Sequence, residues 1–315
     1  MEGIGSVIIL FIAGLAVLMI SSNIFVEAAI KIAERLRVPE IIIGSTIVAI
    51  GTTLPELMVS VTAATQGHSQ MALGNALGSV ICNTALIAGF AQLIRPSELE
   101  YKSFRRSCCE LILVAAIYCF MVMTYGGLTK VCGYILLGLY VVYMVRSYRY
   151  AQKMRVSVSH STAKREPVLM QFVLLFAMAV LLYMGANLIV NNGQVLALYM
   201  GVPEYIVSLT MVALGTSLPE LITAINALVK GHGSLSLGNI IGANLMNLLI
   251  VSGASSAIMP ITAGKEVIML DLPVMLLVLS VLMVPALIRK KISRWQGALL
   301  LLGYATYIAY LFGRG

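Results

Sequence analysis

Two glutamates stand at matching places in two similar stretches of this 315-residue chain, each directly after a proline. Residues 49–57 read AIGTTLPEL, and residues 213–221 read ALGTSLPEL. Glu56 and Glu220 are the only acidic residues deep within the apolar segments, where no lysine or arginine stands ready to pair with them. A charge at the centre of a bilayer costs about 2.5–3.5 kcal/mol on insertion scales. An unfavourable residue placed twice at equivalent positions predicts a functional site.

Hydroxyl and amide side chains accompany the two glutamates. Thr52 and Thr216 lie four residues before them, on the same helical face if each helix is continuous. The other polar side chains nearby in the sequence are Thr53, Ser217, Asn75, Ser79, Asn83, Asn239 and Asn247. Every atom of this set that can bind a cation is an oxygen. Ca²⁺ takes 6–8 oxygen ligands in flexible geometry, whereas transition metals prefer softer ligands. The sequence therefore predicts a site for hard cations such as Ca²⁺.

The prolines before the glutamates predict irregular helices at the same place. A proline inside a helix cannot donate to the carbonyl four residues back, and its ring clashes with that carbonyl. Pro55 and Pro219 would thus free the carbonyls of Gly51 and Gly215. We expect both helices to break there, with free carbonyl oxygens upstream and a helix N-terminus downstream.

The charge of the pair predicts how such a site would work. Two bare carboxylates in a low-dielectric pocket are costly to bury. One Ca²⁺, about two Na⁺ or two protons would neutralise them, so these ions would compete for one pocket. If only the neutralised pocket can be closed and reopened on the other side, the result is exchange.

The repeat extends over the whole chain, and each matching pair of residues is separated by the same number of positions. LGNALGSVICN (73–83) matches LGNIIGANLMN (237–247), and the two glutamate stretches match at the same spacing. Gly74 with Gly78, and Gly238 with Gly242, predict close helix approach through small residues. Five spans per copy is an odd number, so the second copy would enter the membrane upside down, as in the inverted repeats of secondary transporters. We expect one repeat over 1–147, a cytoplasmic linker over 148–167 and a second repeat over 168–315.

The composition places these repeats in a membrane. The chain is 60% hydrophobic and 11% charged, against about 45–50% and 25% for soluble domains. This balance argues against an ordinary soluble enzyme and against a nucleic-acid binder. A spanning helix needs about 20 apolar residues. We expect an all-α integral membrane protein whose ten helices cover 5–26, 41–65, 70–94, 107–124, 130–147, 168–190, 204–228, 234–258, 268–288 and 295–312.

The basic residues predict the orientation. If the N-terminus is outside, all of the 21 Lys and Arg residues except Lys130, Lys265 and Arg314 fall on the inner side, as the positive-inside rule requires. We therefore expect a multi-pass protein of the cell membrane with both termini outside. The five cysteines have no metal-site spacing, and we interpret them as small apolar residues rather than as disulfides.

At these motifs the sequence resembles the prokaryotic type of the sodium/calcium exchanger family, a branch of the cation/calcium antiporters. GTTLPE with GNALGSVICN, and GTSLPE with GNIIGANLMN, carry the resemblance. It implies Ca²⁺/Na⁺ antiport by alternating access, with long first and sixth spans that slide across a fixed core. It also implies the site residues: Glu56 and Glu220 as central Ca²⁺ ligands, Thr52 and Thr216 as cation contacts, Thr53, Ser217, Ser79, Asn83 and Asn247 as Na⁺-site positions, and the carbonyls of Ala49 and Ala213 as backbone ligands.

Two positions depart from the family pattern. Ala243 stands where the family often has a serine, and Asn247 stands where some members have an aspartate. The second half thus loses one hydroxyl and one charge, which leaves the number of coupled ions open and argues against K⁺ co-transport.

Other functions were compared with Na⁺/Ca²⁺ antiport. A H⁺/Ca²⁺ or another monovalent/divalent cation exchanger on the same fold would use the same two carboxylates. A membrane hydrolase could use paired carboxylates for acid–base chemistry, but the sequence offers no nucleophile–base pair. A passive channel is disfavoured by the paired broken helices. We expect neither enzyme activity nor a cofactor. The expected partners are the transported ions and the lipid bilayer, without nucleic acid. A monomer is expected to be the functional unit.

Overall fold

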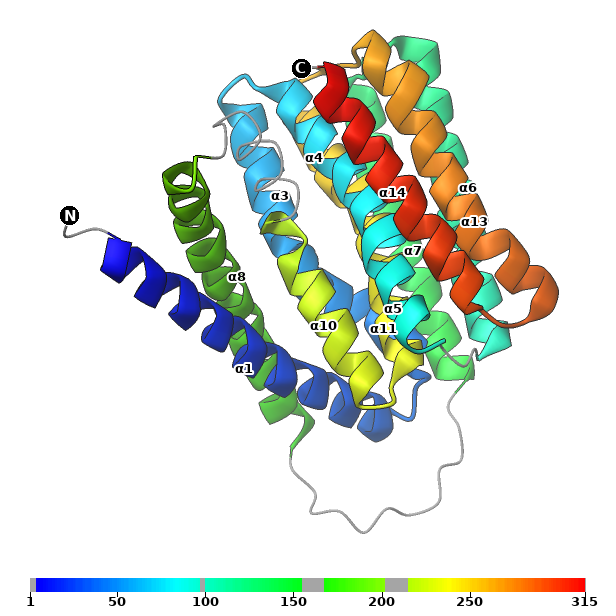
Figure 1. The fold of residues 1–315 in the computed structure, drawn as a ribbon. Coiled ribbons are helices and arrows are strands. Elements are labelled where there is room, and N and C mark those ends of the chain that lie inside the picture. The colour runs from blue at the N-terminus through cyan, green and yellow to red at the C-terminus, as the bar shows by residue number, and fades with distance from the viewer. Residues whose placement is uncertain (1–3, 97–99, 155–166, 202–214, 315) are drawn as a thin grey trace.

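Helices make up nearly all of the described chain (Figure 1). The computed structural model describes residues 4–96, 100–154, 167–201 and 215–314. Two short strands, β1 (Gly127–Leu128) and β2 (Ile261–Thr262), pair antiparallel with Gly127 opposite Thr262. The prediction of an all-helical chain is therefore wrong for these four residues. Gly127 has a φ of 149°, and a Cβ there would collide with the carbonyl oxygen of Ile261, so the close strand contact needs a glycine.

The first half contains seven α-helices and two π-helical segments among the described residues. They are α1 (Ile4–Leu36), α2 (Glu40–Ile43), η1 (Gly44–Val48), α3 (Ala49–Thr65), α4 (Ser69–Ile81), η2 (Cys82–Ala88), α5 (Gly89–Ile94), α6 (Tyr101–Tyr125) and α7 (Lys130–Lys153). The short helices and π segments join into longer stretches, because η1 connects α2 to α3 and η2 connects α4 to α5.

The second half continues the helical pattern after the predicted linker. Its described elements are α8 (Val168–Tyr199), α10 (Leu218–Val229), α11 (Gly233–Met246), η3 (Asn247–Val251), α12 (Ser252–Ile258), η4 (Val267–Asp271), α13 (Leu272–Arg289) and α14 (Arg294–Arg314). Most of the linker predicted over 148–167 lies outside the described residues. Its beginning is helical, because α7 runs on to Lys153, where a basic side chain suits the last turn.

Eight helical stretches in the described residues are long and apolar enough to cross a membrane. They are Ile4–Leu36, Glu40–Thr65, Ser69–Ile94, Tyr101–Tyr125, Lys130–Lys153, Val168–Leu196, Gly233–Ile258 and Val267–Arg289. Each coincides with a predicted span, although α1 continues well beyond residue 26. The two other predicted spans overlap α14 and the 12-residue α10, which follows residues outside the described part of the chain. All five cysteines are free, as predicted.

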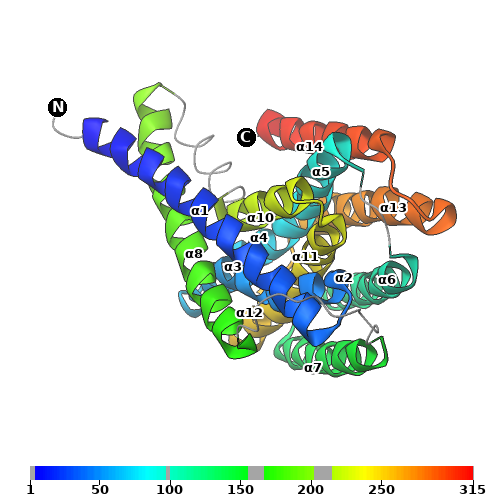
Figure 2. The same cartoon turned by 90° about the horizontal axis from the view of Figure 1, so that it is seen from below.

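Helices α1 and α8 lie side by side and cross the other helices obliquely (Figures 1 and 2). Small residues let the two approach closely: a Cβ at Gly14 would lie 2.8 Å from Cβ of Leu188, and one at Gly185 would lie 2.9 Å from the backbone nitrogen of Leu18. Side chains of this pair form a hydrophobic cluster that includes Phe25, Leu182 and Ile43. A second, larger cluster joins α4, α6, α7, α11 and α13.

Helix α11 lies at the centre of the molecule, and every residue from Leu235 to Met246 is buried. Its glycines contact the chain of the first half, as predicted. A Cβ at Gly242 would lie 2.5 Å from Cα of Ser45, and one at Gly238 would collide with the carbonyl of Ile41. For the corresponding Gly74 and Gly78 of α4, the described residues provide no such neighbour. Gly238 and Gly242 thus allow α2 and η1 to lie directly against α11.

Candidate cation site

The two glutamates share one buried region between the halves of the chain. Glu56 lies within α3 and Glu220 in the first turn of α10, and both side chains are 0% exposed. The Thr53 hydroxyl donates a hydrogen bond to Oε1 of Glu220 at 3.3 Å. The two carboxylates are close enough to interact electrostatically. Residues far apart in the sequence are therefore brought to one place, as the repeat predicted.

The hydroxyl neighbours of the glutamates follow a reciprocal pattern. Thr53 of the first half contacts Glu220 of the second half. Ser217, the counterpart of Thr53, lies within electrostatic range of Glu56, and its Oγ has no hydrogen-bond partner among the described residues. Each half thus places a hydroxyl beside the carboxylate of the other half.

Two asparagines extend this reciprocity. The Thr52 hydroxyl donates to Oδ1 of Asn239 at 3.1 Å, and the Thr216 hydroxyl donates to Oδ1 of Asn75 at 3.4 Å. The amide nitrogen of Asn75 also donates to the backbone carbonyl of Glu56 at 3.2 Å and to Oγ of Ser60 at 2.8 Å. Each half thus supplies an asparagine that accepts a hydrogen bond from a threonine of the other half.

The predicted ligand set did not include Asn75 and Asn239. The sequence showed them only as members of polar helix faces, whereas the structure shows them holding threonines of the opposite half. A signal was present in the sequence, because the two asparagines are equivalent in the repeat. That equivalence does not predict which half each asparagine would contact.

Buried polar atoms without partners gather at the predicted site. More than 90% of buried polar groups in proteins are hydrogen-bonded, and exceptions need an explanation such as a missing water or ion. Among the described residues, the atoms without a hydrogen-bond partner include both carboxylate oxygens of Glu56 and one of Glu220. The others at the site are Oγ of Ser79, Oγ of Ser217, Nδ2 of Asn239, and the Nδ2 and Oδ1 atoms of Asn83 and Asn247. This concentration is the chemistry expected of an enclosed site for cations and their water.

Irregular helix turns present several of these groups. Asn83 lies in the π-helical segment η2, Asn247 begins η3, and η1 ends immediately before Ala49. π-helical turns are rare and frequently occur at functional sites. The Tyr143 hydroxyl donates to the carbonyl of Ser45 in η1 at 2.6 Å and so satisfies one of its backbone acceptors. No pattern in the sequence indicated these turns.

The predicted helix breaks are found in only one half. Pro55 lies inside α3, which continues from Ala49 to Thr65, so the expectation of a break there is wrong. Proline removes a single hydrogen-bond donor, and packing by neighbouring helices keeps the flanking turns helical. In the second half the chain turns at Ser217, and α10 begins at Leu218 with Pro219 in its first turn.

The remaining predicted site residues fall into two groups. Ala49 is buried at the start of α3, and Ala243 is buried in α11 between the two polar positions of that helix face. Ala213 lies outside the described residues. Of the predicted residues, Thr53 bonds to Glu220, and Thr52 and Thr216 bond to asparagines of the opposite half. Glu56, Ser79, Asn83, Ser217 and Asn247 are buried and carry polar atoms that have no hydrogen-bond partner among the described residues.

One buried polar pair was missed entirely. The amide of Asn244 on α11 donates to the Thr84 hydroxyl in η2 at 2.7 Å, and both side chains are 0% exposed. The repeat offers no warning of it, because the equivalent positions are the apolar Val80 and Leu248. Throughout the part of the chain that the structure describes, no group of three or more His, Cys, Asp or Glu side chains could hold a metal ion.

Comparison with known proteins gives matches over the whole chain. The family model described as sodium/calcium exchanger protein matches it twice, over residues 6–149 and again over residues 170–313. The inner membrane protein YrbG of Escherichia coli is 33% identical, with 96% of each chain covered. The sodium/calcium exchanger MaX1 of Methanosarcina acetivorans is 28% identical, covering 96% of this chain and 98% of that one.

A solved structure resembles the fold just as fully. The sodium-calcium exchanger NCX_Mj, soaked with Na⁺ and Sr²⁺, superposes with a TM-score of 0.82 at 29% identity. The match covers 96% of this chain and 97% of that one. The likeness therefore extends over nearly the full length of both chains.

Proposed function

The chain belongs to the sodium/calcium exchanger protein family, and from this premise we propose that it exchanges Ca²⁺ for Na⁺ by alternating access. It is a membrane cation antiporter rather than an enzyme. The observation that carries the specific proposal is the set of buried, unpartnered oxygens around Glu56 and Glu220. Carboxylate, hydroxyl and amide oxygens are the ligands that Ca²⁺ takes.

The charge of the site supports exchange rather than simple binding. Two ionised carboxylates buried without a counterion are strongly unfavourable, and no Lys or Arg contacts either carboxylate among the described residues. One Ca²⁺ would cancel this charge, and Na⁺ ions in the same region would do so too. Because the ions use overlapping ligands, the arrival of one kind favours the release of the other.

The arrangement of α1 and α8 supports a sliding step. The pair rests on the site through Gly51 of α3, where a Cβ would lie 2.9 Å from Phe25 of α1 and 3.3 Å from Ala179 of α8. Polar contacts also join α1 to the core: Asn226 donates to the Ser22 hydroxyl at 2.7 Å, and Lys230 pairs with Glu27. We infer that the pair moves along this surface and uncovers the site on alternate sides.

The same proposal includes the topology. The ends of α1, α5, α7, α10 and α13 lie together at the lower side of Figure 1, and the last turns of these helices, together with the segments and first turns that follow, hold most of the basic residues. This arrangement supports ten spans in two inverted repeats (1–147 and 168–315, joined by the linker 148–167), with that side in the cytoplasm and both termini outside. We propose that one chain suffices for exchange.

Flux in sealed proteoliposomes tests the proposed coupling. Vesicles loaded with Na⁺ are diluted into Na⁺-free medium that contains radioactive Ca²⁺, and uptake is compared with that of protein-free vesicles. Uptake driven by the Na⁺ gradient is the expected result. Vesicles with equal Na⁺ on both sides but an imposed pH gradient form the second arm. Uptake that follows the pH gradient and ignores Na⁺ would contradict the proposal and favour a H⁺/Ca²⁺ exchanger, for which the same carboxylate pair is the supporting observation.

A further inference from the structure

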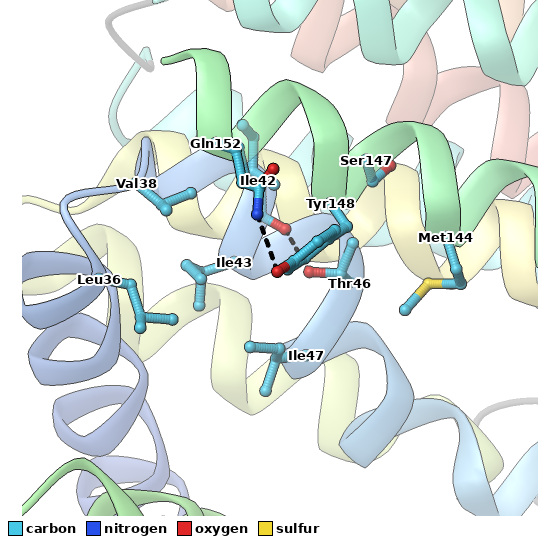
Figure 3. A pocket seen from close by; sticks show the side chains of 11 residues that line it. Leu36, Val38, Ile42, Ile43, Thr46, Ile47, Met144, Ser147, Tyr148 and Gln152 are labelled. Atoms are coloured by element: carbon cyan, nitrogen blue, oxygen red, sulfur yellow. Dashed lines mark hydrogen bonds between the residues drawn. The ribbon is translucent and has the colours of Figure 1, made fainter. Parts of the chain in front are cut away.

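A cavity of about 200 Å³ lies between α7 and the junction of α1 with α2 (Figure 3). None of the proposed cation ligands lines it. Its walls come from three places: the end of α1, the α2–η1 stretch and the last turns of α7. The lining side chains are Leu36, Val38, Ile42, Ile43, Thr46, Ile47, Met144, Ser147, Tyr148, Ala151 and Gln152.

The walls of this cavity are suited to an apolar occupant. Most lining side chains are apolar, and the polar ones near them bond locally. The Thr46 hydroxyl donates to the carbonyl of Ile42 at 2.6 Å, and Gln152 donates to the Tyr148 hydroxyl at 2.8 Å (Figure 3). Tyr148 is 65% exposed, so the mouth of the cavity opens to the surroundings beside it. An aliphatic chain entering there would displace no buried hydrogen bond between protein groups.

Three exposed basic residues stand directly beside lining residues in the sequence. Arg37 lies between the lining residues Leu36 and Val38, while Arg149 and Lys153 each follow a lining residue of α7, and all three are exposed. Helix α7 carries no acidic residue. Basic pockets at the ends of spanning helices recognise anionic lipid head groups. An apolar slot with a cationic rim therefore matches one kind of molecule, a lipid whose head is anionic.

We propose that this cavity binds an anionic phospholipid, with one acyl chain in the slot and the head group among Arg37, Arg149 and Lys153. The slot also has a structural consequence. Ile43 belongs to the hydrophobic cluster of α1 and α8, whereas Ile42 belongs to the larger cluster of the core. An acyl chain in the slot adds apolar contact to both clusters at once, so it stabilises the observed arrangement of α1 against the core. The binding claim does not depend on which ions are exchanged.

Native mass spectrometry of the purified full-length chain tests this proposal. The protein is delipidated and supplied with phosphatidylglycerol or with phosphatidylcholine, both carrying palmitoyl and oleoyl chains. We expect one retained phosphatidylglycerol per chain, favoured over phosphatidylcholine by roughly tenfold. Ala151→Phe fills the slot and should abolish this retention, whereas Val142→Phe, on an exposed face of the same helix, should not.

A charge variant keeps the test valid if Ala151→Phe fails to fold. Arg37→Asn, Arg149→Gln and Lys153→Gln together remove the rim, and asparagine suits the left-handed φ of 55° at position 37. The matched control changes a distant basic loop that also contains one left-handed residue, with Lys290→Asn, Lys291→Gln and Arg294→Gln. We expect the first triple variant to lose the preference for phosphatidylglycerol and the control to keep it.

Four results would overturn the assignment. These are equal retention of the two phospholipids by the unaltered chain, unchanged retention in both Ala151→Phe and the rim variant, displacement of phosphatidylglycerol by equimolar oleate, and a lipid-free dimer that Ala151→Phe dissociates. The third would assign the slot to a free fatty acid, and the fourth to a second copy of the chain. Since no readout depends on Ca²⁺ flux, failure here is distinct from failure of the exchange proposal.

Discussion

The two halves of the candidate cation site match where they meet and differ where they face the rest of the molecule. Thr52 and Asn239, and in return Thr216 and Asn75, form the same hydrogen bond in both directions. Away from this contact the halves diverge. Ser79 of the first half corresponds to Ala243 of the second, and α3 continues through Pro55 whereas α10 begins beside Pro219.

This difference separates two demands on the repeated sequence. Where a side chain of one half bonds to the other half, the matching residue must be kept in both copies. Changing either residue would leave a buried polar group without its hydrogen-bond partner. A group at the edge of the site contacts unique surroundings and is free to change. We therefore expect changes at the matched positions to affect exchange most, and changes at the unmatched positions to alter ion number or stability.

Glu56→Gln and Glu220→Gln provide the strongest test of the matched pair. Each removes one of the two buried negative charges that a Ca²⁺ ion must neutralise, so we expect at least a 100-fold loss of Ca²⁺ flux in proteoliposomes. Glu34→Gln, on the exposed surface of α1, is the control and should transport normally. Normal flux in either buried variant, with the helical circular dichroism retained, would show that the pair is not the cation site.

Asn75→Ala and Asn239→Ala test whether the two halves contribute equally. Asn75 holds Thr216, Ser60 and the carbonyl of Glu56, whereas Asn239 has an amide nitrogen without a partner. We expect Asn75→Ala to raise the KM for Ca²⁺ roughly tenfold, since about 1 kcal/mol is lost per hydrogen bond, and Asn239→Ala to raise it less.

The measurement is the rate of Ca²⁺ flux at increasing Ca²⁺ concentration, with Na⁺ held at a saturating level. This dependence separates KM from the maximal rate. A role confined to folding would lower the amount of active protein and leave KM unchanged. Equal KM in both variants and in the unaltered chain would contradict the positioning role of the asparagines.

Ala243→Ser restores the match at an unmatched position. It adds to α11 the hydroxyl that Ser79 supplies on α4. Ala243 is fully buried beside the polar region, so one more oxygen there should strengthen Na⁺ binding by a fewfold. The readout is the Na⁺ concentration that half-inhibits Ca²⁺ uptake, together with its Hill coefficient. Ser79→Ala should shift that concentration in the opposite direction, and a shift in the same direction would contradict the interpretation.

Thr84→Val should affect exchange least while still affecting stability. It leaves the buried amide of Asn244 without its 2.7 Å partner, which costs about 1–3 kcal/mol. Thermal unfolding should shift to lower temperature, and the double variant Thr84→Val with Asn244→Leu should recover part of the loss. A loss of Ca²⁺ flux beyond that explained by the folded fraction would instead place this pair in the cation pathway.

The sequence allowed the spans and the buried acids to be predicted for clear physical reasons. Long apolar segments have few stable alternatives to helices in lipid, and each predicted span overlaps a described helix. An ionisable residue in such a segment is unfavourable enough to stand out without any structure. The fixed offset between Thr52 and Thr216 also predicted that the two halves would supply equivalent groups.

Other features depended on neighbours that no local pattern encodes. A proline in the sequence indicates that one helical hydrogen bond is lost, but it does not show whether the helix ends. Packing around α3 keeps the helix continuous through Pro55. The π-helical turns at η2 and η3 follow from how these segments fit against α11, α14 and α4 rather than from their composition. The Thr84–Asn244 pair joins two positions whose repeat counterparts are apolar.

By itself, the sequence determined that this chain is helical, membrane-embedded and duplicated, with two acids in its apolar interior, because hydropathy, charge and repetition act along the chain. The tertiary structure decided which oxygens face one another, which hydroxyls are held by Asn75 and Asn239, and where a lipid-sized slot opens beside Tyr148. These are contacts between segments far apart in the sequence. Their geometry is set by how whole helices pack, and no single segment contains that information.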